Sequence, residues 1–120
     1  MVAHLGRHGS PVSAMSEPGA AVFVFAHQDD EVAAASRIAF EMRRGTEVFS
    51  VFLTDGGAPQ IRDEESVAAL GRLGVPRSHI FFPGSAIPIP DGELPLHLET
   101  ALEHLEGVTA GIPIGAVYCL

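Results

Sequence analysis

The sequence predicts an α/β domain of the Rossmann-like, three-layer α/β/α type, with a mainly parallel sheet of about four strands in this chain. Short apolar runs rich in Val and Phe alternate with longer segments whose apolar residues recur every three or four positions. Glycine and proline mark the boundaries between these segments. At 120 residues, the chain has the length of one ordinary domain.

The first strand and helix are predicted near the start of the domain. Residues 21–26 form a short apolar run that is typical of a buried parallel strand. A helix is expected over residues 30–44, ending at Gly45. The apolar positions of this helix that have helical spacing are Val32, Ala35, Ala39 and Met42.

The second strand and helix repeat the same order. Residues 47–54 predict a strand that the turn at residues 55–57 closes, because Asp-Gly-Gly favours chain reversal. A helix is then expected from about residue 62 to residue 73, before Gly74 and Pro76. Three apolar positions on one face of this helix are Val67, Leu70 and Leu73.

The last third of the chain predicts two more strands and one helix. Residues 79–82 indicate a short strand, and residues 83–95 contain too many prolines for a helix or a central strand. A final helix and a fourth strand at residues 115–120 follow. The predicted face of that helix consists of Leu98, Leu102 and Leu105.

Composition excludes several classes of function. The chain has 15 acidic and 7 basic residues and a net charge of -8, so its surface repels nucleic-acid phosphates and anionic lipid. No apolar run is long enough for membrane insertion. The single cysteine, Cys119, lies in an apolar run and is expected to be a buried thiol, which is consistent with a cytoplasmic protein.

The two ends of the chain differ in character. Residues 1–19 mix Gly, Ser, Pro and His without periodicity and lack the apolar stretch of a signal peptide. We predict a disordered tail or an added leader there. The folded domain is expected to cover residues 20–120.

An imidazole and three carboxylates directly follow the first predicted strand, in the run Ala-His-Gln-Asp-Asp-Glu at residues 26–31. In open α/β sheets, ligands bind at the carboxyl ends of strands. Imidazole nitrogen and carboxylate oxygen are usual zinc ligands. Since successive side chains diverge, one of Asp29 and Asp30 is expected to ligate and the other to act as a base. Alternatively, the acids are ordinary helix-capping residues, which leaves His27 unexplained.

This run resembles the signature Ala-His-Pro-Asp-Asp-Glu of the PIG-L or LmbE-like zinc-dependent N-acetyl-sugar deacetylases, with Gln28 at the position of the proline. Three later elements are similar to that family in the same order. They are the second strand and its loop at residues 51–57, the helix pattern Arg-x-x-Glu-x-x-x-Ala at residues 62–69, and Asp-Gly-Glu-Leu at residues 91–94.

The resemblance implies a function and a set of site residues. His27 and Asp30 would hold Zn²⁺, Asp29 would be the general base, and Arg62 and Asp91 would contact sugar hydroxyls of a small N-acetyl-sugar or glycoconjugate substrate. Arg62 has an ordinary alternative as an exposed arginine paired with a neighbouring glutamate of its helix. The ordinary alternative for Asp91 is a turn residue before Gly92.

The family's remaining zinc ligand is a histidine after the fourth strand, and the sequence has no such element. We therefore expect the chain to be the amino-terminal part of a deacetylase that alone binds zinc weakly and is inactive. Otherwise the ligand would come from His79, His97, His104 or a second subunit of a homo-oligomer.

Two other classes of function share parts of this sequence pattern. A nucleotide-binding Rossmann module is disfavoured because the first loop lacks Gly-x-Gly-x-x-Gly and places acids where a pyrophosphate needs N–H groups. A non-catalytic or truncated remnant that acts as a binding or scaffold module stays open. Substrate candidates include N-acetylglucosaminyl inositols, peptidoglycan fragments and antibiotic precursors.

Overall fold

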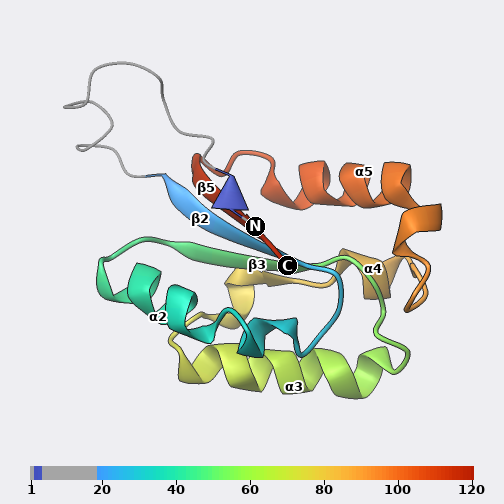
Figure 1. The fold of residues 1–120 in the computed structure, drawn as a ribbon, viewed down its shortest axis with the longest axis horizontal. Coiled ribbons are helices and arrows are strands. Elements are labelled where there is room, and N and C mark those ends of the chain that lie inside the picture. The colour runs from blue at the N-terminus through green and yellow to red at the C-terminus, as the bar shows by residue number, and fades with distance from the viewer. Residues whose placement is uncertain (1, 4–18) are drawn as a thin grey trace.

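The computed structural model describes residues 2–3 and 19–120 and contains a five-stranded sheet in the order β1-β5-β2-β3-β4 (Figure 1). Strands β5, β2, β3 and β4 run parallel to one another, which confirms the predicted Rossmann-like sheet. The short β1 pairs antiparallel with β5. The strand bounds are β1 Val2–Ala3, β2 Ala20–Phe25, β3 Val48–Phe52, β4 Ile80–Phe81 and β5 Ile114–Cys119.

Helices cover both faces of the sheet (Figure 1). Helices α2 (Ala35–Arg43) and α3 (Pro59–Arg72) lie on one face, and α5 (Leu98–Thr109) lies on the other. All six residues of β2 are buried because alternate side chains enter different cores. Phe23 packs in the core under α2 and α3, whereas Val22 packs in the core under α5. The predicted three-layer arrangement is therefore present.

The first helical segment differs from the prediction of one helix over residues 30–44. The chain forms a 3-10 turn, η1 (Asp30–Val32), before α2 begins at Ala35. Because a 3-10 turn has three residues per turn, it changes which side chains face the sheet. Val32 is 70% exposed, and the buried positions are instead Ala34 and Ile38.

Two further segments correct the sequence-based expectations. Residues 83–95, predicted to be free of helix, contain α4 (Pro83–Ala86) and the 3-10 turn η3 (Leu94–Leu96). Proline occupies the first turn of each, where its missing N–H is not needed. Of the predicted face of α5, Leu105 packs against the core of the sheet, whereas Leu98 and Leu102 are exposed and Ala101 is buried instead.

Smaller differences concern element ends. Helix α3 begins at Pro59, before the predicted residue 62, and a 3-10 turn, η2 (Arg77–His79), precedes β4. The predicted tail at residues 1–19 falls largely outside the described residues, and within it Val2–Ala3 form β1, whose backbone pairs with Val117 and Tyr118 of β5. Among the helices of the described residues, none has the length and apolar character needed to cross a membrane.

Candidate active site

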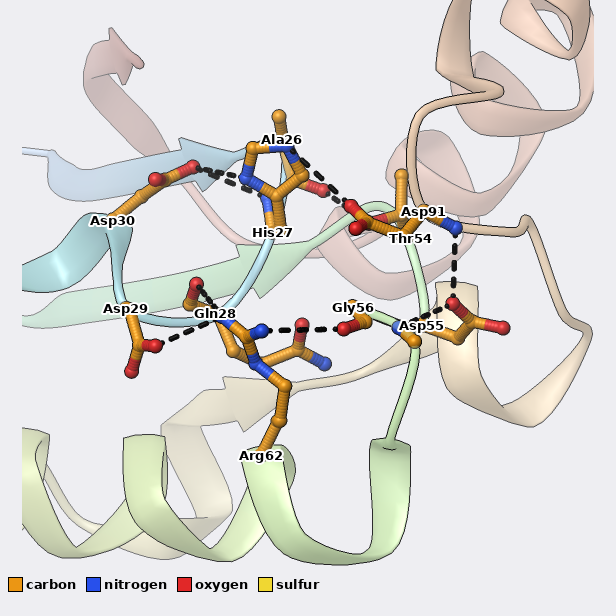
Figure 2. A network of polar contacts seen from close by, with 11 residues as sticks. Ala26, His27, Gln28, Asp29, Asp30, Thr54, Asp55, Gly56, Arg62 and Asp91 are labelled. Carbon is orange, nitrogen blue, oxygen red and sulfur yellow. Dashed lines mark hydrogen bonds and ion pairs between the residues drawn. The ribbon is translucent and has the colours of Figure 1, made fainter.

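The predicted site residues meet at the carboxyl ends of β2 and β3 (Figure 2). His27, Asp29 and Asp30 follow β2, because the chain leaves this strand directly into η1. Arg62 comes from the first half of α3, and Asp91 comes from the loop that follows α4. The structure therefore brings together five residues from three separate segments of the sequence, although their chemical roles stay predictions.

His27 lies between two carboxylates. Its Nδ1 is 3.1 Å from Asp30 Oδ2, and its backbone N–H donates to the same oxygen at 3.2 Å. On the other side of the ring, Nε2 is 3.7 Å from Asp91 Oδ1. The imidazole is 43% exposed and the Asp30 side chain 31%, so a small ion can reach both.

The pair of His27 and Asp30 fits two ligands of one zinc ion. Tetrahedral zinc with bonds of roughly 2.0–2.2 Å holds neighbouring ligand atoms about 3.3 Å apart, close to the observed separation of Nδ1 and Oδ2. Within residues 2–3 and 19–120, no group of three or more His, Cys, Asp or Glu side chains is arranged to hold a metal ion. The donor types of this pair match two of the three protein ligands that a catalytic zinc ion has.

The adjacent carboxylates of Asp29 and Asp30 point in different directions (Figure 2). Asp29 has φ 78°, and it is the one non-glycine residue with positive φ in the part of the chain that the structure describes. This left-handed conformation costs about 1–2 kcal/mol in an L-residue. It turns the Asp29 carboxylate to Arg62, whose Nη2 donates to Oδ2 at 2.8 Å. Asp30 is thereby left beside His27.

Arg62 joins the two loops of the site. Besides Asp29, its Nη2 donates to the carbonyl of Gln28 at 3.0 Å, and its Nη1 donates to the carbonyl of Gly56 at 3.3 Å. The alternative, in which Arg62 pairs with Glu65 or Glu64 of its own helix, does not form in the described structure. Glu64 instead accepts a hydrogen bond from the exposed Arg77 at 2.7 Å, which raises the pKa of Arg77.

Sequence reasoning missed the role of the Gln28 side chain. Gln28 is 1% exposed, and its Nε2 donates to Asp63 Oδ1 at 2.6 Å. The hydroxyl of Ser85 in α4 donates to the same oxygen at 3.1 Å. The one signal in the sequence for this role was that Gln28, a polar residue, replaces the proline of the family signature. Nothing in the sequence indicated Asp63 as its partner, 35 positions away.

The turn after β3 fixes the loop that carries Asp91. One carboxylate oxygen of Asp55, Oδ1, accepts the backbone N–H groups of Gly57 at 2.9 Å and of Asp91 at 3.1 Å. The N–H of Asp55 donates to the carbonyl of Ile89. Asp55 therefore does more than form its own turn, because it holds the backbone of Asp91 beside the imidazole of His27.

The remaining histidines with described positions lie in other surroundings. His79 precedes β4 and so lies at the amino end of the parallel strands, opposite the site. Its ring stacks on Phe49 with the two ring centroids 4.2 Å apart. His97 pairs with Glu93 at 3.3 Å. His104 lies on α5 and lines a cavity of about 310 Å³ between α4 and α5.

The fold and the site define a Rossmann-like α/β protein with an imidazole and carboxylate cluster at the carboxyl end of its sheet. A family model described as PIG-L, GlcNAc-PI de-N-acetylase, matches residues 22–120, and the chain belongs to this family. No curated protein and no solved structure matches the chain. The resemblance seen in the motif is confirmed, and membership indicates a hydrolase of the de-N-acetylase type.

Proposed function

We propose that this chain forms the metal- and base-bearing part of a zinc-dependent hydrolase that removes the acetyl group from an N-acetylated amino sugar. One observation carries the proposal. The neighbouring carboxylates of Asp29 and Asp30 face different partners, so that one lies beside an imidazole and the other is held by Arg62. This division provides a ligand pair and a separate base within four consecutive residues.

His27 and Asp30 are the residues that would hold the metal ion. A bound zinc ion supplies Lewis-acid polarisation of a carbonyl and lowers the pKa of a coordinated water to about 7. Since a catalytic zinc has three protein ligands, the proposal includes a third donor besides this pair. That donor comes from another segment or from a second subunit.

Asp29 is the proposed general base. Its side chain is 62% exposed, and Arg62 donates to Oδ2, which leaves Oδ1 to accept a proton from the attacking water. The same oxygen can later return the proton to the leaving amine nitrogen as the amide C–N bond breaks. A positioned base of this kind contributes about 10²–10⁴-fold to the rate.

Asp91 and Arg62 are the proposed contacts to the sugar. The Asp91 side chain is 49% exposed and can accept hydrogen bonds from hydroxyl groups. Arg62 has five N–H donors, and three of its hydrogen bonds go to protein oxygens, which leaves two N–H groups for substrate hydroxyls. Arg62 therefore acts both in holding the loop and in contacting the substrate.

The proposed partner is a small N-acetyl-sugar or glycoconjugate in the cytoplasm. A net charge of -8 favours neither nucleic acid nor an anionic membrane surface as a ligand. The choice among N-acetylglucosaminyl inositols, peptidoglycan fragments and related amides depends on residues that contact the part of the substrate beyond the acetamide.

The test combines metal content with acetate release. Protein prepared with zinc is assayed for bound metal and for acetate released from an N-acetylglucosaminide, with His27→Ala as the matched variant. We expect zinc binding that depends on His27 and, once the third ligand is present, acetate release that depends on the metal. Zinc binding unchanged in His27→Ala would contradict the proposed centre. Zinc binding without hydrolysis under any condition would favour the non-catalytic alternative.

A further inference from the structure

Consecutive residues of α3 hold the site loop from two sides. Arg62 binds the carbonyl of Gln28 and the carboxylate of Asp29, as Figure 2 shows, and Asp63 binds the side-chain amide of Gln28. Asp63 is itself held by the hydroxyl of Ser85 in α4. The loop between the two proposed ligands is therefore tied to two helices through its middle residues.

The environment of Gln28 is unusual for an amide. The side chain is 1% exposed, and in the described part of the structure its Oε1 has no hydrogen-bond partner, while Nε2 makes a short bond to a carboxylate. An unpartnered buried acceptor destabilises a fold, whereas a hydrogen bond to a charged group is among the stronger ones. The cost of the unpartnered Oε1 therefore offsets the stabilisation from the Nε2 hydrogen bond. The main effect of the buried amide is to fix the position of the loop.

Gly56 lies against the side-chain amide of Gln28. A Cβ atom at Gly56 would overlap Gln28 Oε1, whereas a Cβ atom at the neighbouring Gly57 would meet nothing within 4 Å. Both glycines have positive φ, at 65° and 85°. Only the absence of a side chain at Gly56 lets the Gln28 amide lie between the loop and α3.

We propose that Gln28 is a positioning residue, which through its hydrogen bond to Asp63 holds the loop in the shape that places His27 Nδ1 beside Asp30 Oδ2. The mechanical part of this inference rests on the contacts alone, and its consequence for metal binding rests on the proposed function. Asp29 lies next to Gln28 in a left-handed conformation that the backbone leaves readily. When the anchor is lost, relaxation at Asp29 turns Asp30 away from the imidazole.

The test exchanges the two partners of the hydrogen bond. Gln28→Glu places a carboxylate against the carboxylate of Asp63, which breaks the bond without changing side-chain size. Adding Asp63→Asn restores an amide and carboxylate pair with the donor on the other side. Its Nδ2 takes the place of Oδ1, so it can donate one N–H to the new carboxylate at position 28 and the other to the Ser85 hydroxyl, which then accepts where it donated before. Gln60→Glu is the matched control. Gln60 is exposed on α3, the helix that carries Asp63, and the substitution makes the same change in charge as Gln28→Glu.

Two readouts are measured on the full 120-residue chain. Hydrogen exchange of metal-free protein follows the amides of His27, Asp30 and Val32, which are bonded within the loop. Competition with a chromophoric chelator gives the zinc dissociation constant. We expect Gln28→Glu to accelerate loop exchange and to weaken zinc binding about tenfold or more, with the double variant returning to within about threefold of wild type. Gln60→Glu should match wild type in both readouts.

A second pair of variants leaves Gln28 itself unchanged. Gly56→Ala is expected to displace the Gln28 side chain and to reproduce the faster loop exchange, whereas Gly57→Ala, with the same backbone strain, should show less effect. Thermal unfolding followed by circular dichroism establishes that each variant is folded. This comparison keeps the inference testable if Gln28→Glu fails to fold.

The outcomes separate this inference from the proposed function. Loop exchange in Gln28→Glu that matches Gln60→Glu, or a double variant that stays as perturbed as the single one, would overturn the positioning role. Wild-type protein that binds no zinc while Gln28→Glu still frees the loop would overturn the proposed function and leave the positioning role intact.

Discussion

Arg62 offers the sharpest test of how the site loop is held. Its guanidinium makes three hydrogen bonds, to the carboxylate of Asp29 and to the carbonyls of Gln28 and Gly56. The ion pair is partly exposed and contributes about 0.5 kcal/mol, while each bond from the charged group to a carbonyl contributes about 1 kcal/mol at this half-buried position. Arg62→Ala should therefore lower the free energy of unfolding by about 2.5 kcal/mol.

The assay is urea unfolding followed by circular dichroism, together with a thermal scan. A loss of about 2.5 kcal/mol lowers the melting temperature of a domain of this size by roughly 10 °C. Arg72→Ala is the matched control, because Arg72 is exposed in the last turn of the same helix and should change stability by less than about 0.5 kcal/mol. Arg62→Lys should recover only part of the loss, since an ammonium group does not span three acceptors as the planar guanidinium does.

The account of Arg62 would be refuted by Arg62→Ala unfolding at the same urea concentration as Arg72→Ala. A double-mutant cycle with Asp29→Ala separates the ion pair from the carbonyl contacts. We expect a coupling energy below about 1 kcal/mol between these two partly exposed side chains. A larger coupling would show that the carbonyl contacts contribute less than the structure indicates.

Two further predictions concern packing and loop geometry. Gly84→Ala should destabilise the fold by about 1–3 kcal/mol because a Cβ atom there would overlap the backbone of Leu53, whereas Gly107→Ala, in open space on α5, should be neutral or stabilising in the same thermal scan. Asp55→Ala removes the acceptor of the Asp91 N–H, so hydrogen exchange of the Asp91 amide should become faster, and an unchanged exchange rate would contradict this role of Asp55.

The fold was largely predictable from local pattern. β2 lies between β3 and β5 as the order of a doubly wound sheet requires, and its six buried residues explain its continuous apolar run. The register of the first helix was not predictable. It depends on the left-handed conformation of Asp29 and on the 3-10 turn after it, which place Ala34 and Ile38 rather than Val32 against the sheet.

The residues of the site were predictable as types, and their contacts were not. His27 and Asp30 are three positions apart, so the chain itself brings them together, and family resemblance supplied Arg62 and Asp91. The bond between Gln28 and Asp63 joins residues 35 positions apart across packed elements, and no local pattern indicates such a pairing. Short-range chemistry was therefore visible in the sequence, while the support for that chemistry required the tertiary structure.

The proposed function depends on different roles for two adjacent carboxylates, with Asp30 as a zinc ligand and Asp29 as a base. Zinc titration of matched variants tests this difference most directly. Isothermal titration calorimetry compares the wild-type chain with Asp29→Asn and Asp30→Asn, which change the same charge at neighbouring positions. We predict that Asp30→Asn weakens zinc binding by at least about tenfold and that Asp29→Asn leaves it within about threefold of wild type. Loss of zinc binding in Asp29→Asn together with its retention in Asp30→Asn would contradict the account and reverse the two roles.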